Sequence, residues 1–134
     1  IKKDLDAYYR AHMDKDWGAV YDYLSENLQD ILSSSMNGEE ALKMFQKMKN
    51  NNPDIALNKD RDKFIAVTEI SMQALGYLSS YSILKMSAVN SRKITIKINV
   101  KETRIVNGKK DETKMELVWV FKNSNWRINE INAQ

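Results

Sequence analysis

The chain has 134 residues, which is the usual length of one domain. Hydrophobic residues make up 43% of it and charged residues 29%, a balance that excludes an intrinsically disordered chain and allows a sizeable core. The net charge is +3 at pH 7, and acidic residues alternate with the lysines, so we expect a solvated surface and no nucleic-acid partner.

The residue types present limit the possible chemistry. The absence of cysteine excludes disulfides, cysteine nucleophiles and thiolate metal sites. His12 is the single histidine and has no cluster of acids beside it, so we expect no metal site. The four glycines are too far apart to form a phosphate loop or a dinucleotide fingerprint, and we expect no cofactor. No apolar run is long enough to span a membrane.

The N-terminal part of the chain has the spacing of amphipathic helices. Residues 4–14 predict a first helix, and Asp16 is a good N-cap for a second one after a kink at 16–18. The apolar stripes of these two helices are Leu5, Tyr8, Tyr9, His12 and Met13, then Val20, Tyr21, Leu24 and Leu28.

A third helix is predicted after Asn37, which can cap it together with Glu40 three residues later. Pro53 predicts its end, because the residue before a proline avoids helical dihedral angles. Its expected buried stripe consists of Ala41, Leu42, Met44, Phe45 and Met48.

The middle of the chain changes from helical to strand-like patterning. Residues 64–72 are rich in β-branched side chains and predict a strand, although the residues that follow could extend a helix. Residues 81–89 predict a weaker strand, with a turn at 79–82.

Asn107-Gly108 is a strong hairpin signal, since both residues tolerate positive φ angles. Counting outward from a two-residue loop gives apolar partners on one face, which fixes the register. The opposite, more solvated face is expected to carry Arg104 across from Asp111 and Asn99 across from Glu116. The expected apolar pairs are Val100 with Met115, Ile98 with Leu117, Ile96 with Trp119 and Ile94 with Phe121.

A second two-residue loop at Asn123-Ser124 would continue the sheet. It places Trp126 opposite Phe121 and Ile128 opposite Trp119, on the same apolar face. The result is a three-stranded antiparallel meander over residues 93–131. Its apolar face needs a cover, and the N-terminal helices are available for it. We therefore predict a single α+β domain spanning residues 1–134, with three helices packed on a bent antiparallel sheet.

Two stretches resemble the nuclear-transport-factor-2-like superfamily, the cone-shaped fold of SnoaL-like and ketosteroid-isomerase-like proteins. One is "AYYRAHMDKDWGAVYDYLS" near the start, and the other is "WVFKNSNWRINEI" at the end. The order of elements covers nearly the whole chain. The N-terminal half also resembles extension domains of penicillin-binding transpeptidases and small cell-envelope lipoproteins.

The resemblance implies a pocket between the helices and the concave face of the sheet. Enzymes of this superfamily pair a carboxylate with a tyrosine there, and Tyr8 or Tyr9 falls roughly where such a tyrosine could sit. No acidic residue is expected at the middle of the inner face to act with such a tyrosine. Glu102 and Glu130 are expected on this face, but at its ends. The candidate pocket or core residues are Tyr8, Tyr9, His12, Trp17, Tyr21, Phe45, Ile96, Ile98, Met115, Leu117, Trp119, Phe121 and Trp126.

We accordingly expect a non-catalytic binding or assembly domain. It would act through protein partners, a homodimer or a small hydrophobic ligand, and Lys97, Val118 and Val120 on the outer sheet face are a candidate interface. The start at Ile1 predicts a processed product or a cut chain, preceded by a signal peptide, lipid-anchor segment or membrane helix. An extracellular or cell-envelope location is expected, with a cytoplasmic one left open. The alternatives are an isomerase or dehydratase of the ketosteroid-isomerase type and an assembly subunit of type IV secretion.

Overall fold

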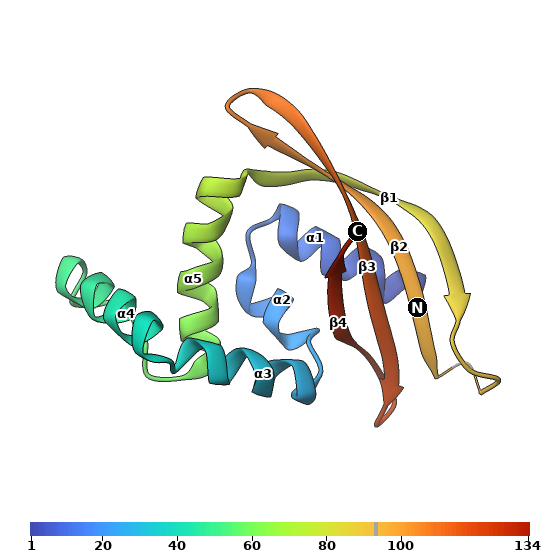
Figure 1. Ribbon diagram of the computed structural model, residues 1–134, viewed down its shortest axis with the longest axis horizontal. Coiled ribbons are helices and arrows are strands. Elements are labelled where there is room, and N and C mark those ends of the chain that lie inside the picture. Colours follow the sequence, from blue (N-terminus) through green and yellow to red (C-terminus); the bar gives the residue numbers. More distant parts are fainter. Residues whose placement is uncertain (93) are drawn as a thin grey trace.

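The computed structural model describes residues 1–92 and 94–134 and has an α+β fold in which the helices precede the strands (Figure 1). None of the described helices is long and apolar enough to cross a membrane. The elements in chain order are α1 (Lys2–Met13), α2 (Trp17–Asp22), α3 (Glu26–Met36), α4 (Glu39–Asn51), α5 (Asp60–Leu75), β1 (Tyr77–Ala88), β2 (Thr95–Val106), β3 (Lys109–Lys122) and β4 (Asn125–Ala133).

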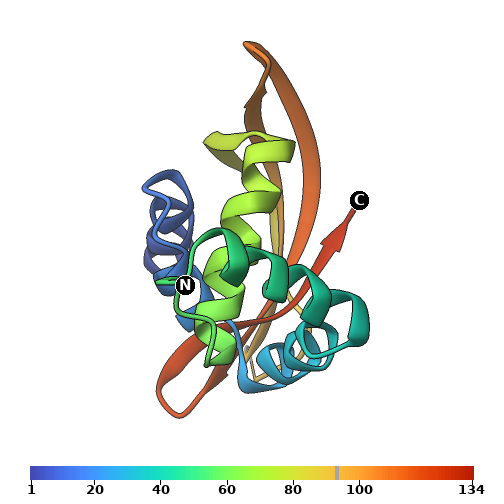
Figure 2. The ribbon, with the colours of Figure 1, turned by 90° about the vertical axis from the view of Figure 1, so that its left-hand side faces the viewer.

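The strands form one antiparallel sheet in the order β1-β2-β3-β4. The sheet curves around α1 and α2, while α3 and α5 lie farther out on the same side (Figure 1). Its other face carries none of the described helices, as the view turned by 90° also shows (Figure 2). The helices therefore gather on the concave face, where the apolar residues of the strands point.

The hairpin between β2 and β3 has the predicted register. Asn107 and Gly108 form its loop with φ angles of 51° and 78°. The predicted start of the meander, residue 93, lies outside the described residues. The pairs that occur as predicted are Arg104 with Asp111, Val100 with Met115, Asn99 with Glu116, Ile98 with Leu117 and Ile96 with Trp119.

The loop at Asn123 and Ser124 is also confirmed, and it pairs Phe121 with Trp126 and Trp119 with Ile128. Trp119 is fully buried, but Phe121 is 43% exposed, so its predicted place in the core is wrong. Phe121 lies at the tip of the hairpin, where its ring packs against Trp126 at 5.2 Å between centroids. Ile94, at the same end of the sheet, is exposed as well.

A β-bulge in β4 changes which residues face inward. The register shifts between the partners of Val118 and Trp119, so Glu130 lies opposite Val118 and Ile131 opposite Leu117. Glu130 therefore lies on the outer face with Val118. The prediction that Glu130 lies on the inner face is wrong. The same shift brings Ile131 to the inner face.

The predicted second helix is broken in two. Asp16 caps α2 as expected, accepting a hydrogen bond from the Ala19 amide at 3.2 Å. The chain then leaves the helix, and the Ser25 hydroxyl oxygen caps α3 by accepting from the Leu28 amide at 3.1 Å. The break has a tertiary cause, because the Ser25 amide donates to the Ile128 carbonyl at 2.8 Å and ties this junction to β4.

The helix predicted after Asn37 begins at Glu39, with Gly38 at the N-cap and no side-chain cap. Asn37 instead ends α3, where its side-chain amide donates to the Ser33 carbonyl at 2.7 Å. The end before Pro53 is confirmed. The predicted buried stripe is mostly wrong, because Phe45 is buried whereas Leu42 is 48% exposed and Met44 is also exposed. Helix α4 projects from the body of the domain, which explains this exposure (Figure 1).

Residues 64–72 belong to the helix α5, so the predicted strand is wrong. Asp60 and Asp62 in its first turn favour a helix through the helix dipole. The helix ends at Gly76, whose φ of 94° and close approach to the Ile105 carbonyl suit only glycine. The predicted turn at 79–82 is wrong too, since these residues lie inside β1, next to an irregularity between Leu78 and Ser80.

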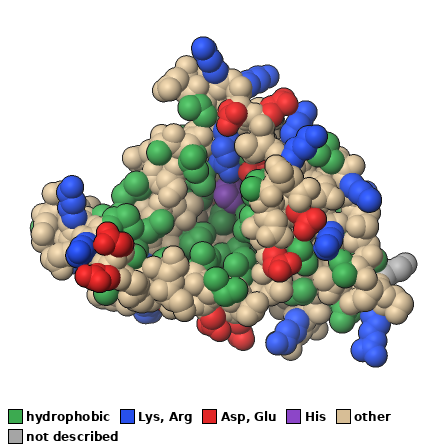
Figure 3. Space-filling view, viewed as in Figure 1, with side chains coloured by type: hydrophobic (Ala, Val, Ile, Leu, Met, Phe, Trp, Pro, Cys, Tyr) green, Lys and Arg blue, Asp and Glu red, His purple; other side chains and the backbone are tan. Residues whose placement is uncertain are grey.

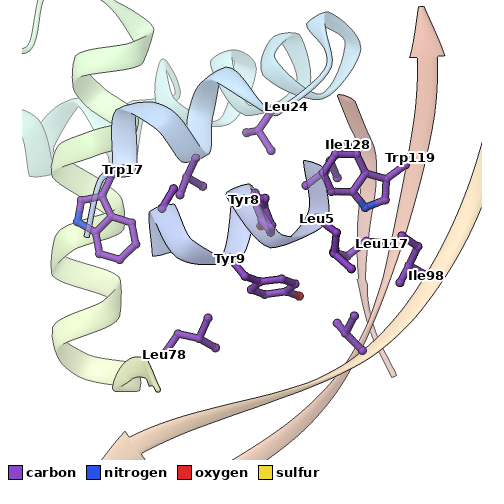
Figure 4. Close-up of a cluster of buried hydrophobic side chains, with 13 residues drawn as sticks. Leu5, Tyr8, Tyr9, Trp17, Leu24, Leu78, Ile98, Leu117, Trp119 and Ile128 are labelled. Carbon is purple, nitrogen blue, oxygen red and sulfur yellow. The ribbon is translucent and has the colours of Figure 1, made fainter. Parts of the chain in front are cut away.

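The core lies between α1 and the middle of the sheet (Figure 4). Leu5, Tyr8 and Tyr9 of α1 point toward the strands, and the rings of Tyr8 and Trp119 meet edge to face at 6.1 Å. The fully buried side chains are Leu5, Tyr9, Ile98, Val100, Leu117, Trp119 and Ile128.

The capping role of Ser25 is testable by Ser25→Ala. The substitution removes the α3 cap and the hydrogen bond that the Ser25 hydroxyl makes with Asn129 at 2.9 Å. We expect the free energy of unfolding to fall by about 1–2 kcal/mol in urea titrations. Ser34→Ala in the same helix is the matched control, because Ser34 is exposed and caps no helix. Equal losses in the two variants would contradict the assigned role.

Candidate functional site

A cavity of about 350 Å³ opens between the helices and β4. The space-filling view shows it as a hollow with hydrophobic walls and the single histidine at its floor (Figure 3). The residues that line it are Tyr8, His12, Val20, Leu24, Leu28, Leu32, Phe64, Thr68, Ser71, Met72 and Ile131.

The lining follows from helical spacing on three elements. In α5, Phe64, Thr68 and Met72 are four residues apart and share one side of the helix. Leu28 and Leu32 have the same spacing in α3, as Tyr8 and His12 have in α1. The β4 bulge supplies Ile131. The wall is therefore built from elements that are far apart in the sequence.

His12 is the most unusual group in this wall. It is only 8% exposed, and its ring meets those of Tyr8 and Trp17 edge to face at 4.8 and 5.6 Å. Among the described residues its Nδ1 has no hydrogen-bond partner. Burial, and secondarily the positive charge of Arg104, lowers the pKa of His12 from 6.5 to about 4. The imidazole is therefore neutral at pH 7.

A buried polar network lies beside the cavity. The Tyr9 hydroxyl donates to Glu102 Oε2 at 2.7 Å, and Arg104 Nη2 donates to Glu102 Oε1 at 3.0 Å. Glu102 is 7% exposed, and each of its carboxylate oxygens is occupied by one of these donors. Burial, and then the Glu102 charge, raises the pKa of both Tyr8 and Tyr9. Both phenols are therefore protonated at neutral pH.

Arg104 connects this network to the cavity. Its Nη1 donates to the Gly76 carbonyl at 3.2 Å and contacts the Met72 sulfur at 3.0 Å. The sequence interpretation placed Arg104 on the solvated face, which is wrong. Arg104 shares the inner face with Val100 and Glu102, since alternate residues of β2 point the same way. Arg104 and Glu102 also line a second hollow of about 560 Å³ with several charged side chains.

The predicted pocket or core residues separate into distinct groups. Only Tyr8 and His12 line the cavity. Phe45 is buried in α4, apart from the main core, and Phe121 is exposed as described above. Tyr9, Trp17, Ile98, Leu117 and Trp119 are buried in the core, while Tyr21, Ile96, Met115 and Trp126 are half-buried against it.

Most of the cavity wall was not predicted from the sequence. Phe64, Thr68, Ser71 and Met72 were missed because their segment was interpreted as a strand. The spacing of three or four residues between Phe64, Thr68 and Ser71 or Met72 was the available signal for a helix face. Ile131 was missed because a bulge leaves no clear mark in the sequence.

The candidate interface on the outer sheet face is uneven. Lys97 is exposed and Val120 is half-buried, but Val118 is only 5% exposed. Lys97 and Glu130 flank Val118 on the neighbouring strands, in positions where their aliphatic stems can cover it. Val118 thus offers little surface to a partner.

Within residues 1–92 and 94–134, no three His, Asp or Glu side chains are grouped so that they could hold a metal ion.

No protein-family model matches the chain, and no curated protein sequence matches it. Among solved structures, the intermembrane space region of the chloroplast protein ARC6 is similar at 12% identity and a TM-score of 0.37, covering 95% of each chain. A likeness of this size assigns neither a fold family nor a function.

The depressed pKa of His12 predicts a loss of stability in acid. The unfolded chain binds a proton at His12 below pH 6.5, whereas the folded chain does so only near pH 4. Above pH 6.5, His12 is neutral in both states and does not lower the free energy of unfolding. As the pH falls from 6.5 to 4, protonation of His12 in the unfolded chain lowers the free energy of unfolding by about 3 kcal/mol.

Urea titrations between pH 7 and pH 4 would measure this loss. His12→Phe keeps an aromatic ring between Tyr8 and Trp17 but cannot be protonated, so its stability should fall less over the same range. The comparison isolates His12 from the carboxylates, which titrate in both proteins. Parallel pH profiles of the two proteins would show that His12 titrates normally.

Proposed function

We propose that this protein is a non-catalytic binding domain that holds a small hydrophobic ligand in the cavity between α1, α3, α5 and β4. The observation that carries the proposal is the cavity itself, about 350 Å³ with a mainly aliphatic and aromatic wall. Ligand pockets in proteins typically measure roughly 300–1,000 Å³ and have walls of this kind. Burial of a ligand's apolar surface would supply the binding free energy.

The groups around the cavity favour binding over catalysis. An isomerase or dehydratase of the ketosteroid-isomerase type needs a free carboxylate and a tyrosine facing one pocket. Here Tyr9 and Glu102 do come together, but outside the cavity wall, and the carboxylate is already bound by Tyr9 and Arg104. Such a carboxylate is poorly placed to remove a proton from a ligand.

We also propose that the chain belongs to the nuclear-transport-factor-2-like superfamily, which its sequence resembles. This proposal is supported by the curved antiparallel sheet with helices on its concave side (Figure 1). Export to the cell envelope, a lipoprotein anchor, a homodimer and a role in type IV secretion stay predictions. The low exposure of Val118 gives the sheet-face dimer no added support.

Binding can be tested with N-phenyl-α-naphthylamine, an uncharged apolar dye that fluoresces more strongly in apolar surroundings. We expect the wild-type protein to bind it saturably. Ser71→Trp places a large side chain in the cavity wall and should weaken binding at least about tenfold, because the apolar volume open to the dye is lost.

Gln73→Trp is the matched control, since Gln73 is exposed on the same helix and outside the cavity wall. It should bind the dye as the wild type does. Absence of saturable binding to the wild type, or equal binding by wild type and Ser71→Trp, would refute the proposed site.

A further inference from the structure

The cavity combines an apolar wall with one buried, unsatisfied nitrogen base. His12 lies at the floor of the hollow, 8% exposed, and its Nδ1 lacks a hydrogen-bond partner among the described residues (Figure 3). A buried polar atom without a partner is destabilising relative to one that forms a hydrogen bond. A ligand group that bonds to the imidazole would remove this destabilisation and fix the orientation of the ligand.

The geometry gives a ligand access to the ring. His12 is part of the cavity wall, so its small exposed surface faces the space that a ligand would occupy. Nδ1 itself is shielded, and a half rotation about the Cβ–Cγ bond would exchange its place with that of the Cδ2 carbon. Such a rotation moves the side chain alone and leaves α1 in place, so the proposed contact would need a turn of the ring and no change of the fold.

The surroundings of His12 limit the charge of the ligand group. Tyr8, four residues away on the same helix, is a protonated phenol, and Trp17 is uncharged. Arg104 is the nearby cation, and its charge is matched by Glu102 at 3.0 Å. An ammonium group would lose its water shell and meet no free anion. A carboxylate would lose its water shell against a neutral imidazole and an arginine that is already paired.

An uncharged hydroxyl group avoids both costs. It can donate to or accept from a ring nitrogen, so it suits either tautomer of the neutral imidazole. We propose, on the basis of the function proposed above, that the cavity binds an apolar molecule with one hydroxyl group, and that His12 forms a hydrogen bond with that hydroxyl. Thr68 and Ser71 in the wall offer further hydroxyls but lie on α5, so a separate variant can distinguish them from His12.

The test compares naphthalene, β-naphthol and β-naphthoate, which share one apolar skeleton, by isothermal titration calorimetry at pH 7. The wild type should bind β-naphthol about tenfold more tightly than naphthalene, and β-naphthoate more weakly than β-naphthol. His12→Phe should still bind naphthalene but lose the preference for β-naphthol. In the wild type, β-naphthol should also shift the imidazole nitrogen resonances of His12, whereas naphthalene should shift them much less.

The outcomes separate this inference from the proposed function. If the wild type binds none of the three compounds, the proposed function fails and this inference fails with it. If naphthalene binds but β-naphthol binds no more tightly, or if β-naphthoate binds best, only this inference is overturned. Loss of the β-naphthol preference in Thr68→Val instead of His12→Phe would assign the hydroxyl to Thr68 and overturn it as well. The nitrogen resonances keep the test decisive if His12→Phe does not fold.

Discussion

The Glu102–Arg104 ion pair joins the elements around which the rest of the domain is arranged. Glu102 accepts from Tyr9 of α1, and Arg104 donates to the carbonyl of Gly76 at the end of α5. One pair of residues on β2 thus connects both α1 and the end of α5 to the sheet. A buried ion pair adds little net stability compared with apolar packing, but removing one partner costs about 3–5 kcal/mol. Its main consequence is therefore to specify how α1 and α5 sit on the sheet.

The cavity exists because the surrounding helices are anchored at different places. Helix α3 is attached through the hydrogen bonds between Ser25 and β4, whereas α5 is attached through Gly76 and through Glu69, which accepts from Trp17 at 2.8 Å. Between these anchors, α5 presents Thr68 and Ser71, whose side chains are small. Protein interiors normally close such gaps, because unfilled space forfeits van der Waals contacts. An open apolar space held between fixed helices is what a ligand-binding domain needs.

The hairpins could be predicted from the sequence because their signals are local. A loop of two residues with positive φ fixes the register, and every further pair follows by counting, as Ile98 with Leu117 shows. The α2–α3 break and the β4 bulge could not be predicted in this way. The break depends on Ser25 meeting Ile128, more than a hundred positions away, and the bulge has no composition of its own.

Helix α5 shows why the candidate site was harder to predict than the fold. Its β-branched residues favour a strand in isolation, whereas in the helix Phe64, Ile65 and Met72 pack against the core. Because this helix was predicted as a strand, the residues that it contributes to the cavity wall could not be predicted. Arg104 was missed for a related reason, because an arginine opposite an aspartate is usual on a solvated face.

The same arginine links the electrostatics of the site to its selectivity. A free buried cation beside the cavity would attract anionic ligands, but Glu102 matches its charge, and Tyr9 occupies the remaining carboxylate oxygen. What remains of its field acts on His12, where it adds to burial in disfavouring the imidazolium form. The cavity is therefore uncharged although an ion pair lies next to it. Selection among ligands would then depend on their shape and on a single hydrogen bond at His12, because the residues that line the cavity include no Asp, Glu, Lys or Arg.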